Sequence, residues 1–192
     1  MEKKYVVAFD QGTTSTRTII FDKKGEIVAI SQKELNQYYP KPGWVEHDAL
    51  EIYNDQLETF NQAVSDSGIN PKDIAAIGIT NQRETTVVWD RETGEPIHKA
   101  IVWLDKRTTD ICKKIEDKGL SNYIKKNTGL VVDSYFSGTK LKWVLDHVEG
   151  AQEKAECINL YWALERCWAM PAGDKRQECG MEETSMEDFE DM

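Results

Sequence analysis

Residues 8–17 read Ala-Phe-Asp-Gln-Gly-Thr-Thr-Ser-Thr-Arg, and this stretch joins two runs of strand-forming residues. The run that leads into it is Tyr-Val-Val-Ala-Phe, and the run that follows is Thr-Ile-Ile-Phe, so we expect strand, tight turn and strand. Gly12 lacks a Cβ, which lets the backbone turn sharply and lets a ligand approach closely. A further strand is expected over residues 26–32, so the chain should begin with a β-meander.

The turn carries side chains that suit phosphate. Asp10 leaves the first strand as a carboxylate, which is a usual way to hold Mg²⁺ beside a phosphate. Thr13, Thr14 and Ser15 add hydroxyls and successive N–H groups that can bind phosphate oxygens. From these residues alone, a phosphate site and an ordinary polar hairpin turn both stay open, because the spacing of a P-loop or a dinucleotide fingerprint is absent.

Helical and extended patterns alternate after the meander, which predicts an α/β fold with a mixed sheet. Asp48 is expected to cap a helix over residues 49–65. That helix should pack inward through the apolar residues that recur at helical spacing: Leu50, Tyr53, Leu57, Phe60 and Val64. Residues 74–80 are nearly all apolar, as expected for a strand that is covered on both faces.

Later elements are expected as a strand over 85–90 and helices over 106–118, 120–127 and 139–148. From Cys157 onward the chain has nine acidic and three basic residues, so the composition changes there. We therefore divide the chain into a domain over 1–156 and an atypical tail over 157–192. An aromatic helix is expected over 157–170, and the acidic end over 182–192 is expected to be disordered.

Composition excludes several functional classes. A net charge of −10 argues against a nucleic-acid partner, because phosphate backbones need a basic surface. No apolar run is long enough to span a membrane, and the N-terminus has no signal-peptide pattern, so a cytoplasmic location is expected. The four cysteines have neither zinc-site nor disulfide-framework spacing and are interpreted as reduced thiols: Cys112, Cys157, Cys167 and Cys179.

A second polar cluster follows the buried strand over 74–80. Residues 80–86 read Thr-Asn-Gln-Arg-Glu-Thr-Thr, and ligand sites of α/β sheets gather at such strand ends. Arg83 can donate to hydroxyl oxygens and Glu84 can accept from hydroxyls, so the pair could bind a polyol. A surface salt bridge between them is the alternative.

Together these motifs resemble the glycerol kinase branch of the FGGY family of carbohydrate kinases. The resemblance covers residues 3–155 and is carried by six stretches: 10–15, 39–48, 78–85, 100–103, 127–130 and 135–140. It implies the start of an actin-like, ribonuclease-H-like domain that is incomplete in this chain. It also implies a kinase that uses ATP and Mg²⁺ to phosphorylate glycerol to sn-glycerol 3-phosphate, in a family whose full-length members oligomerise.

The resemblance also implies roles for individual residues. Asp10 matches the magnesium-linked carboxylate of the family. The loop facing the nucleotide phosphates is matched by Thr13, Thr14 and Ser15, with a further phosphate contact at Arg17. The glycerol hydroxyls would be bound by Arg83, Glu84 and Tyr135, with Trp103 as an apolar wall.

The family's catalytic base has no match in this chain. That base is an Asp in a Gly-Asp-Gln run, and no such run occurs in these 192 residues. We therefore assign no catalytic residue and expect no turnover by the chain alone. Two other interpretations stay open: a non-catalytic module that binds a polyol or a partner, and a gene fragment without function.

Overall fold

The computed structural model describes residues 4–156 and 160–164, and these residues form two compact units. Unit 1 holds residues 4–38 and 47–82, and unit 2 holds residues 39–46 and the described residues from 83 onward. Each unit has its own hydrophobic cluster and is described by itself. The part of the chain that the structure describes contains no helix long and apolar enough to cross a membrane.

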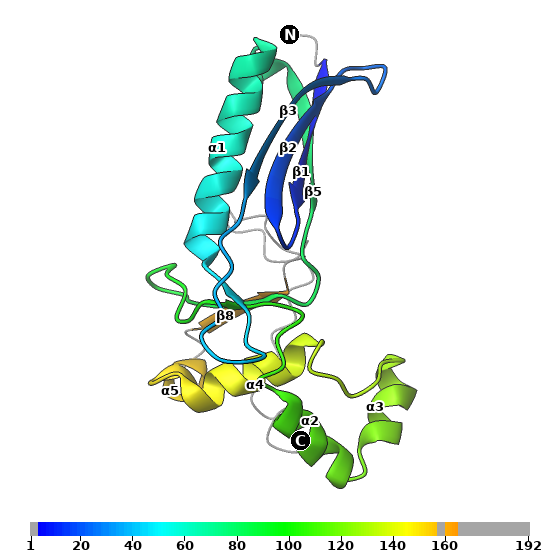
Figure 1. Cartoon of the computed structure of the whole chain (residues 1–192), viewed down its shortest axis with the longest axis vertical. Helices are drawn as coiled ribbons and strands as arrows, with labels where there is room; N and C mark the ends of the chain where they lie inside the picture. The colour runs from blue at the N-terminus through cyan, green and yellow to red at the C-terminus, as the bar shows by residue number, and fades with distance from the viewer. Residues whose placement is uncertain (1–3, 157–159, 165–192) are drawn as a thin grey trace. The chain divides into compact units, whose positions relative to one another are not determined.

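The sheet of unit 1 confirms the expected β-meander (Figure 1). β1 (Tyr5–Gln11), β2 (Ser15–Phe21) and β3 (Ile27–Glu34) are successive antiparallel neighbours. After the short 3-10 helix η1 (Pro71–Asp73), β5 (Ile74–Thr80) runs parallel to β1, so the sheet is mixed and its order is β3-β2-β1-β5.

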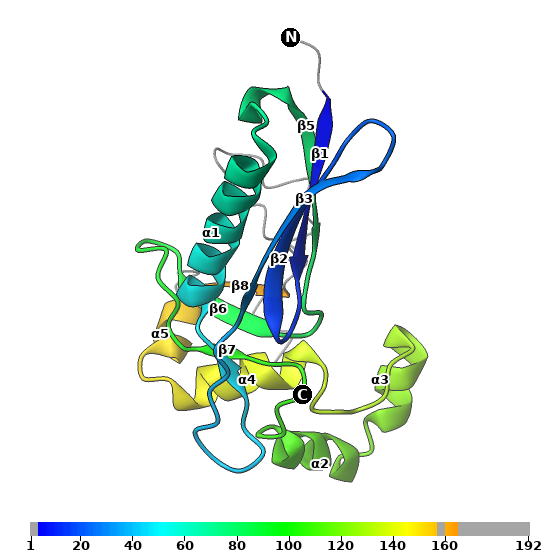
Figure 2. The same cartoon turned by 45° about the horizontal axis from the view of Figure 1, so that its top comes forward.

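Helix α1 (Ala49–Ser67) lies along one face of this sheet (Figures 1 and 2). Asp48 caps it as predicted, because its carboxylate accepts from the backbone N–H groups of Leu50 and Glu51. Gly68 ends the helix with φ 65°, a left-handed conformation that glycine adopts without a Cβ penalty. The core below α1 is built on Val7, Ile20 and Ala63.

The prediction of the buried face of α1 was wrong for three residues. Leu50, Tyr53 and Leu57 are 46%, 42% and 40% exposed. Phe60 and Val64 do pack against the core, as expected. The residues that α1 buries are Ala49, Ile52, Gln56, Thr59 and Ala63. The helix is rotated toward its polar side because Gln56 and Thr59 find hydrogen-bond partners on β2, and a satisfied polar group can be buried.

Strand β5 also differs from the prediction, because it is not covered on both faces. Ile77 and Ile79 are each 48% exposed, and Val6 on the neighbouring β1 is 44% exposed. β5 is an edge strand of the sheet among the described residues. An apolar run therefore predicted the strand correctly, but it did not determine what packs against each face.

The second sheet has the order β4-β7-β6-β8, and all of it except His47 of β4 belongs to unit 2. Its strands are β4 (Glu46–His47), β6 (Thr86–Asp90), β7 (Ala100–Ile101) and β8 (Leu160–Leu164). β8 corrects the expected helix over 157–170, because residues 160–164 pair antiparallel with β6. The backbone groups of residues 160–164 pair with those of β6, and such pairing with a distant strand overrides a helical sequence pattern. The acidic end over 182–192 lies outside the described residues.

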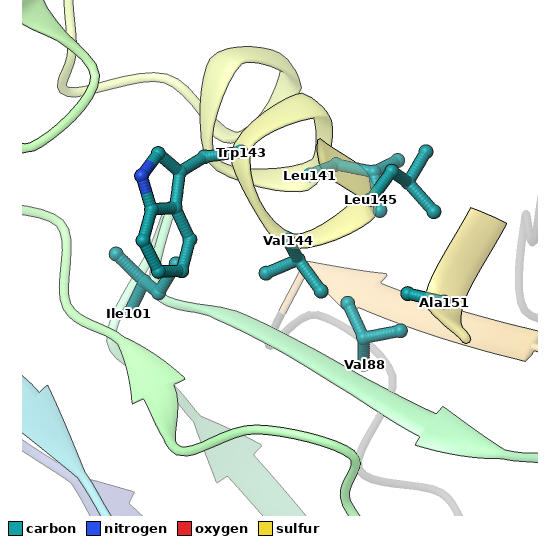
Figure 3. Close-up of a cluster of buried hydrophobic side chains, with 7 residues drawn as sticks. All are labelled: Val88, Ile101, Leu141, Trp143, Val144, Leu145 and Ala151. Carbon is teal, nitrogen blue, oxygen red and sulfur yellow. The ribbon is translucent and has the colours of Figure 1, made fainter. Parts of the chain in front are cut away.

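Four helices complete unit 2: α2 (Thr109–Asp117), α3 (Ser121–Thr128), α4 (Ser137–His147) and α5 (Ala151–Glu156). The first three confirm the predicted helices, although α4 begins two residues earlier than expected. α4 packs on the sheet through Leu141, Val144 and Leu145, which meet Val88 and Ile101 (Figure 3). This packing holds the start of α4, and the loop before it, in a fixed relation to β6.

Candidate functional site

The predicted phosphate turn is a tight hairpin between β1 and β2 in unit 1. The N–H of Gly12 donates to the carbonyl of Ser15 over 2.9 Å. A Cβ at Gly12 would lie 3.1 Å from that carbonyl oxygen, so the close approach favours glycine here. Thr14 accepts from the N–H of Leu35 over 2.9 Å, which ties the turn to the end of β3. Thr13 and Ser15 are half-buried, while the Thr14 side chain is exposed.

Asp10 and Arg17 face each other across the two strands that flank this turn. They are direct cross-strand partners, and their charged groups lie 3.9 Å apart. Both side chains are more than a third exposed, so the pair adds little stability. The Nε of Arg17 is buried and has no hydrogen-bond partner among the described residues. The arrangement leaves a carboxylate and a guanidinium beside one turn, where a metal-bound phosphate could use both.

A buried network of polar side chains joins β1 and β2 to α1 beside the turn, and the sequence analysis did not predict it. Gln11 at the end of β1 donates to Thr16 over 2.5 Å and to Gln56 on α1 over 2.7 Å. Gln56 in turn donates to Thr18 over 2.8 Å, and Thr18 meets Thr59 over 3.0 Å. The signal was present in β2 as Thr16 and Thr18, which alternate on its buried side. The network fixes the hairpin to the helix.

The predicted polyol residues Glu84, Trp103 and Tyr135 all lie in unit 2. The ring centroids of Trp103 and Tyr135 are 5.8 Å apart at 65°, an edge-to-face contact. Tyr135 also meets Phe136 edge to face at 5.1 Å. The N–H of Trp103 donates to the hydroxyl of Thr85, one residue after Glu84, over 3.3 Å. Trp103 is thereby brought to a residue 18 positions before it and to a ring 32 positions after it.

Glu84 has a left-handed backbone conformation, and its side chain is hydrogen-bonded to Ser137. Its φ is 67°, and it is the one non-glycine residue with positive φ among those that the structure describes. Such a conformation costs about 1–3 kcal/mol and clusters at functional sites. Its Oε2 accepts from the backbone N–H of Ser137 over 3.1 Å and from the Ser137 hydroxyl over 2.8 Å. The carboxylate therefore satisfies the first turn of α4, as a capping acid does.

Arg83 does not form the salt bridge with Glu84 that was the alternative interpretation. Its side chain is exposed and makes no ion pair with any residue in the described part of the chain. The carboxylate of Glu84 binds Ser137 instead. The guanidinium of Arg83 is thus available to a ligand, although the structure gives it no fixed partner.

A buried arginine, also missed from the sequence, organises the loop over 39–46. Arg107 lies between the rings of Trp44 and Trp143, with its guanidinium carbon 4.0 and 4.6 Å from their centroids. Its Nη2 donates to Asp105 over 2.9 Å and to Glu46 over 2.8 Å. These contacts hold the Trp44 end of the loop to Arg107 within unit 2, while the Nη1 of Arg107 is buried without a hydrogen-bond partner among the described residues.

The comparisons with known proteins agree with this arrangement. The N-terminal domain of the FGGY family of carbohydrate kinases matches residues 5–166. The glycerol kinase of Ligilactobacillus salivarius (strain UCC118) is 58% identical over 168 residues, which are 88% of this chain and 33% of that protein. Glycerol kinase 2 of Thermotoga maritima is 59% identical over 153 residues, 80% of this chain and 31% of that protein. The chain thus spans about a third of the length of these relatives.

The solved structures confirm the expected fold class. The crystal structure of Plasmodium falciparum glycerol kinase with ADP superposes with a TM-score of 0.77 at 32% identity. The match covers 84% of this chain and 32% of that chain. The fold is therefore that of an actin-like α/β N-terminal domain, present here in part. The division at residue 156 stays a prediction, and the family match runs on to residue 166.

Proposed function

Because this chain belongs to the FGGY family of carbohydrate kinases, we propose that it is the N-terminal part of an ATP-dependent glycerol kinase. The reaction is the phosphorylation of glycerol to sn-glycerol 3-phosphate. The observation that carries the proposal is the 58% identity to a glycerol kinase over most of this chain. The proposed location is the cytoplasm, and the proposed small-molecule partners are glycerol and ATP.

The glycerol contacts are assigned to four residues of unit 2. Arg83 would donate to hydroxyl oxygens, and Glu84 would accept from a hydroxyl through Oε1, which no described residue binds. Trp103 would form an apolar wall against the carbon chain, and Tyr135 would offer its phenol to a hydroxyl. A site of this kind rejects ligands that leave its polar groups unpaired, which is how a short triol can be selected.

The nucleotide contacts are assigned to unit 1, at the hairpin between β1 and β2. The residues proposed to face the phosphates are Thr13, Thr14, Ser15 and Arg17. Phosphoryl transfer depends mostly on positioning and charge neutralisation, which these donors would supply.

Asp10 is the proposed Mg²⁺ ligand. It suits the ion because its carboxylate is partly exposed beside the turn. Mg²⁺ is usually bound by one or two carboxylates together with substrate phosphates, and among the described residues no cluster of three or more metal-binding side chains exists. A single carboxylate that shares the ion with ATP fits this donor set. The ion would neutralise negative charge on the phosphates when it is bound.

The 192-residue chain alone is proposed to bind glycerol weakly and to have no turnover, because it contains no Gly-Asp-Gln run. Losing one acid–base group typically costs about a hundred- to ten-thousand-fold in rate. The alternative, a polyol- or partner-binding fragment without catalysis, makes the same prediction for turnover. The two differ in whether adding the remaining two-thirds of such a kinase restores activity.

Calorimetric titration of glycerol into the isolated chain tests the proposal. Glycerol has six heavy atoms, so even a complete site is limited to about 9 kcal/mol, and half a site should give a dissociation constant of about 1 mM or weaker. We expect Arg83→Ala to weaken binding about tenfold, because a hydrogen bond to a charged group is worth about 1.5–3 kcal/mol. The matched control Arg91→Ala, an exposed arginine of the same unit, should bind as the unchanged chain does.

Two results would contradict the proposal. A micromolar dissociation constant would mean that this chain carries a complete polyol site rather than one side of it. Formation of glycerol 3-phosphate from ATP, abolished by Arg83→Ala in the same preparation, would show that the chain needs no additional base.

A further inference from the structure

Lys140 is a fully buried lysine on the first turns of α4, and the proposed function leaves it without a role. Its exposed fraction is 0%. The ammonium turns back toward the loop before the helix and donates to three carbonyl oxygens. The distances are 2.7 Å to Ser134, 2.5 Å to Tyr135 and 3.3 Å to Phe136. An ammonium has three N–H donors, so all of its hydrogen-bonding capacity serves one short loop.

This position is unfavourable for a cation on two counts. Burial of an ammonium costs several kcal/mol, and the N-terminus of a helix carries a positive partial charge. The compensation comes from acids of other segments, since the carboxylate of Glu84 lies at the first N–H of α4. Burial lowers the pKa of Lys140 to about 8, while Glu84, Asp105 and Asp133 oppose that shift.

The hydrogen bonds of Lys140 fall on the peptide units around Tyr135. The carbonyls of Ser134 and Tyr135 belong to the peptide bonds before and after this residue, so both are fixed. The N–H of Tyr135 is fixed as well, because it donates to Asp133 over 2.7 Å. With the backbone held on both sides, the direction of the Cα–Cβ bond of Tyr135 is set, and its ring meets both Trp103 and Phe136 edge to face.

We propose that Lys140 is a positioning residue that holds the loop over 134–136 so that Tyr135 stays against Trp103. Its importance for a polyol rests on the proposed function, but the geometry of the loop does not. Lys140 makes no contact with the ligand in this proposal and acts through Tyr135.

The pH dependence of this contact separates positioning from simple packing. Deprotonation leaves a neutral amine with two N–H donors for three carbonyls, so the loop should loosen as pH rises through about 8. The titratable groups that face Lys140 are Glu84, Asp105, Asp133 and Cys112. Burial raises the pKa of the Cys112 thiol above its usual value. A change centred near pH 8 would therefore come from Lys140.

The experiment follows the nuclear Overhauser cross-peak between the ring protons of Tyr135 and Trp103 in the full chain. Lys140→Met keeps the length of the side chain but removes the donors, and Lys142→Met is the matched control on the same helix. Lys142 is 44% exposed and pairs with Asp146. We expect the cross-peak at pH 7 in the unchanged chain and in Lys142→Met, and its loss in Lys140→Met. In the unchanged chain it should weaken with a midpoint near pH 8.

Persistence of the cross-peak in Lys140→Met would overturn the proposal. If that variant does not fold, the titration of the unchanged chain decides, and an invariant cross-peak from pH 7 to 9.5 would overturn it equally. Glycerol titration then separates the two proposals. If glycerol binds, Lys140→Met should weaken it at least fivefold, whereas absence of glycerol binding in the unchanged chain counts against the proposed function and leaves the ring contact as the test of Lys140.

Discussion

At the scale of single residues, several buried polar groups among the described residues have specific partners from distant segments. Glu84 shows the pattern, since its carboxylate holds Ser137 while its own backbone is strained at φ 67°. Lys140 and Arg107 are cations that the fold encloses and pairs. Six buried side-chain atoms of the described residues have no hydrogen-bond partner, and the Nε2 of His47 is one of them.

His47 should make stability depend on pH. Burial lowers its pKa to about 4 from an ordinary value of 6.5. The unfolded chain therefore binds the proton first, so the contribution is complete above pH 6.5 and is lost as the pH falls toward 4. The slope is about 1.4 kcal/mol per pH unit at most, since one proton is involved. Urea unfolding of the unchanged chain and of His47→Gln at several pH values measures it, and identical pH profiles for the two proteins would refute the assignment.

At the scale of elements, α1 shows how hydrogen bonding sets which face of a helix is buried. The apolar stripe through Leu50 and Leu57 was a sound helical signal, but the polar network around Gln56 rotates those residues outward. Ile52 lies on the buried side instead, with an exposed fraction of 2%. The helix was therefore predictable, and its orientation was not.

A pair of truncations on α1 tests this orientation. Ile52→Ala should lower the free energy of unfolding by about 2–4 kcal/mol, because it removes buried methylene groups and leaves a cavity. Leu57→Ala is the matched control and should cost less than about 1 kcal/mol, since Leu57 is 40% exposed. Urea unfolding gives the change in free energy for each variant from the shift of its midpoint, provided that the denaturant slope is unchanged. Equal losses at the two positions would favour the predicted face over the observed one.

At the scale of the whole molecule, the described chain leaves apolar surface uncovered on an edge strand. Ile77 and Ile79 of β5 are each 48% exposed, and exposed apolar edge strands are templates for association.

Charges on this strand should reduce association without unfolding the chain. We expect the double substitution Ile77→Lys and Ile79→Lys to lower concentration-dependent association in sedimentation velocity, at an unchanged urea midpoint. Ile74→Lys is the contrasting variant on the same strand. Ile74 packs against the core of unit 1, so its replacement should lower the midpoint instead. Undiminished association in the double variant would mean that the chain does not associate through β5.

Local patterns in the sequence determined the β-meander, α1 with its Asp48 cap, α2 to α4 and the family. These features depend on residues that are close in sequence, such as the Asp48 carboxylate and the N–H of Leu50. The family motifs also selected Glu84, Trp103 and Tyr135, but not how they meet.

Only the tertiary structure decided which partners those residues have. The bond from Glu84 to Ser137 spans 53 positions, and Gln11 meets Gln56 across 45. Pairing with β6 likewise made residues 160–164 a strand where a helix was expected. Burial and hydrogen bonding between distant segments have no local signature, because the free energy of each contact depends on what the rest of the fold brings against it.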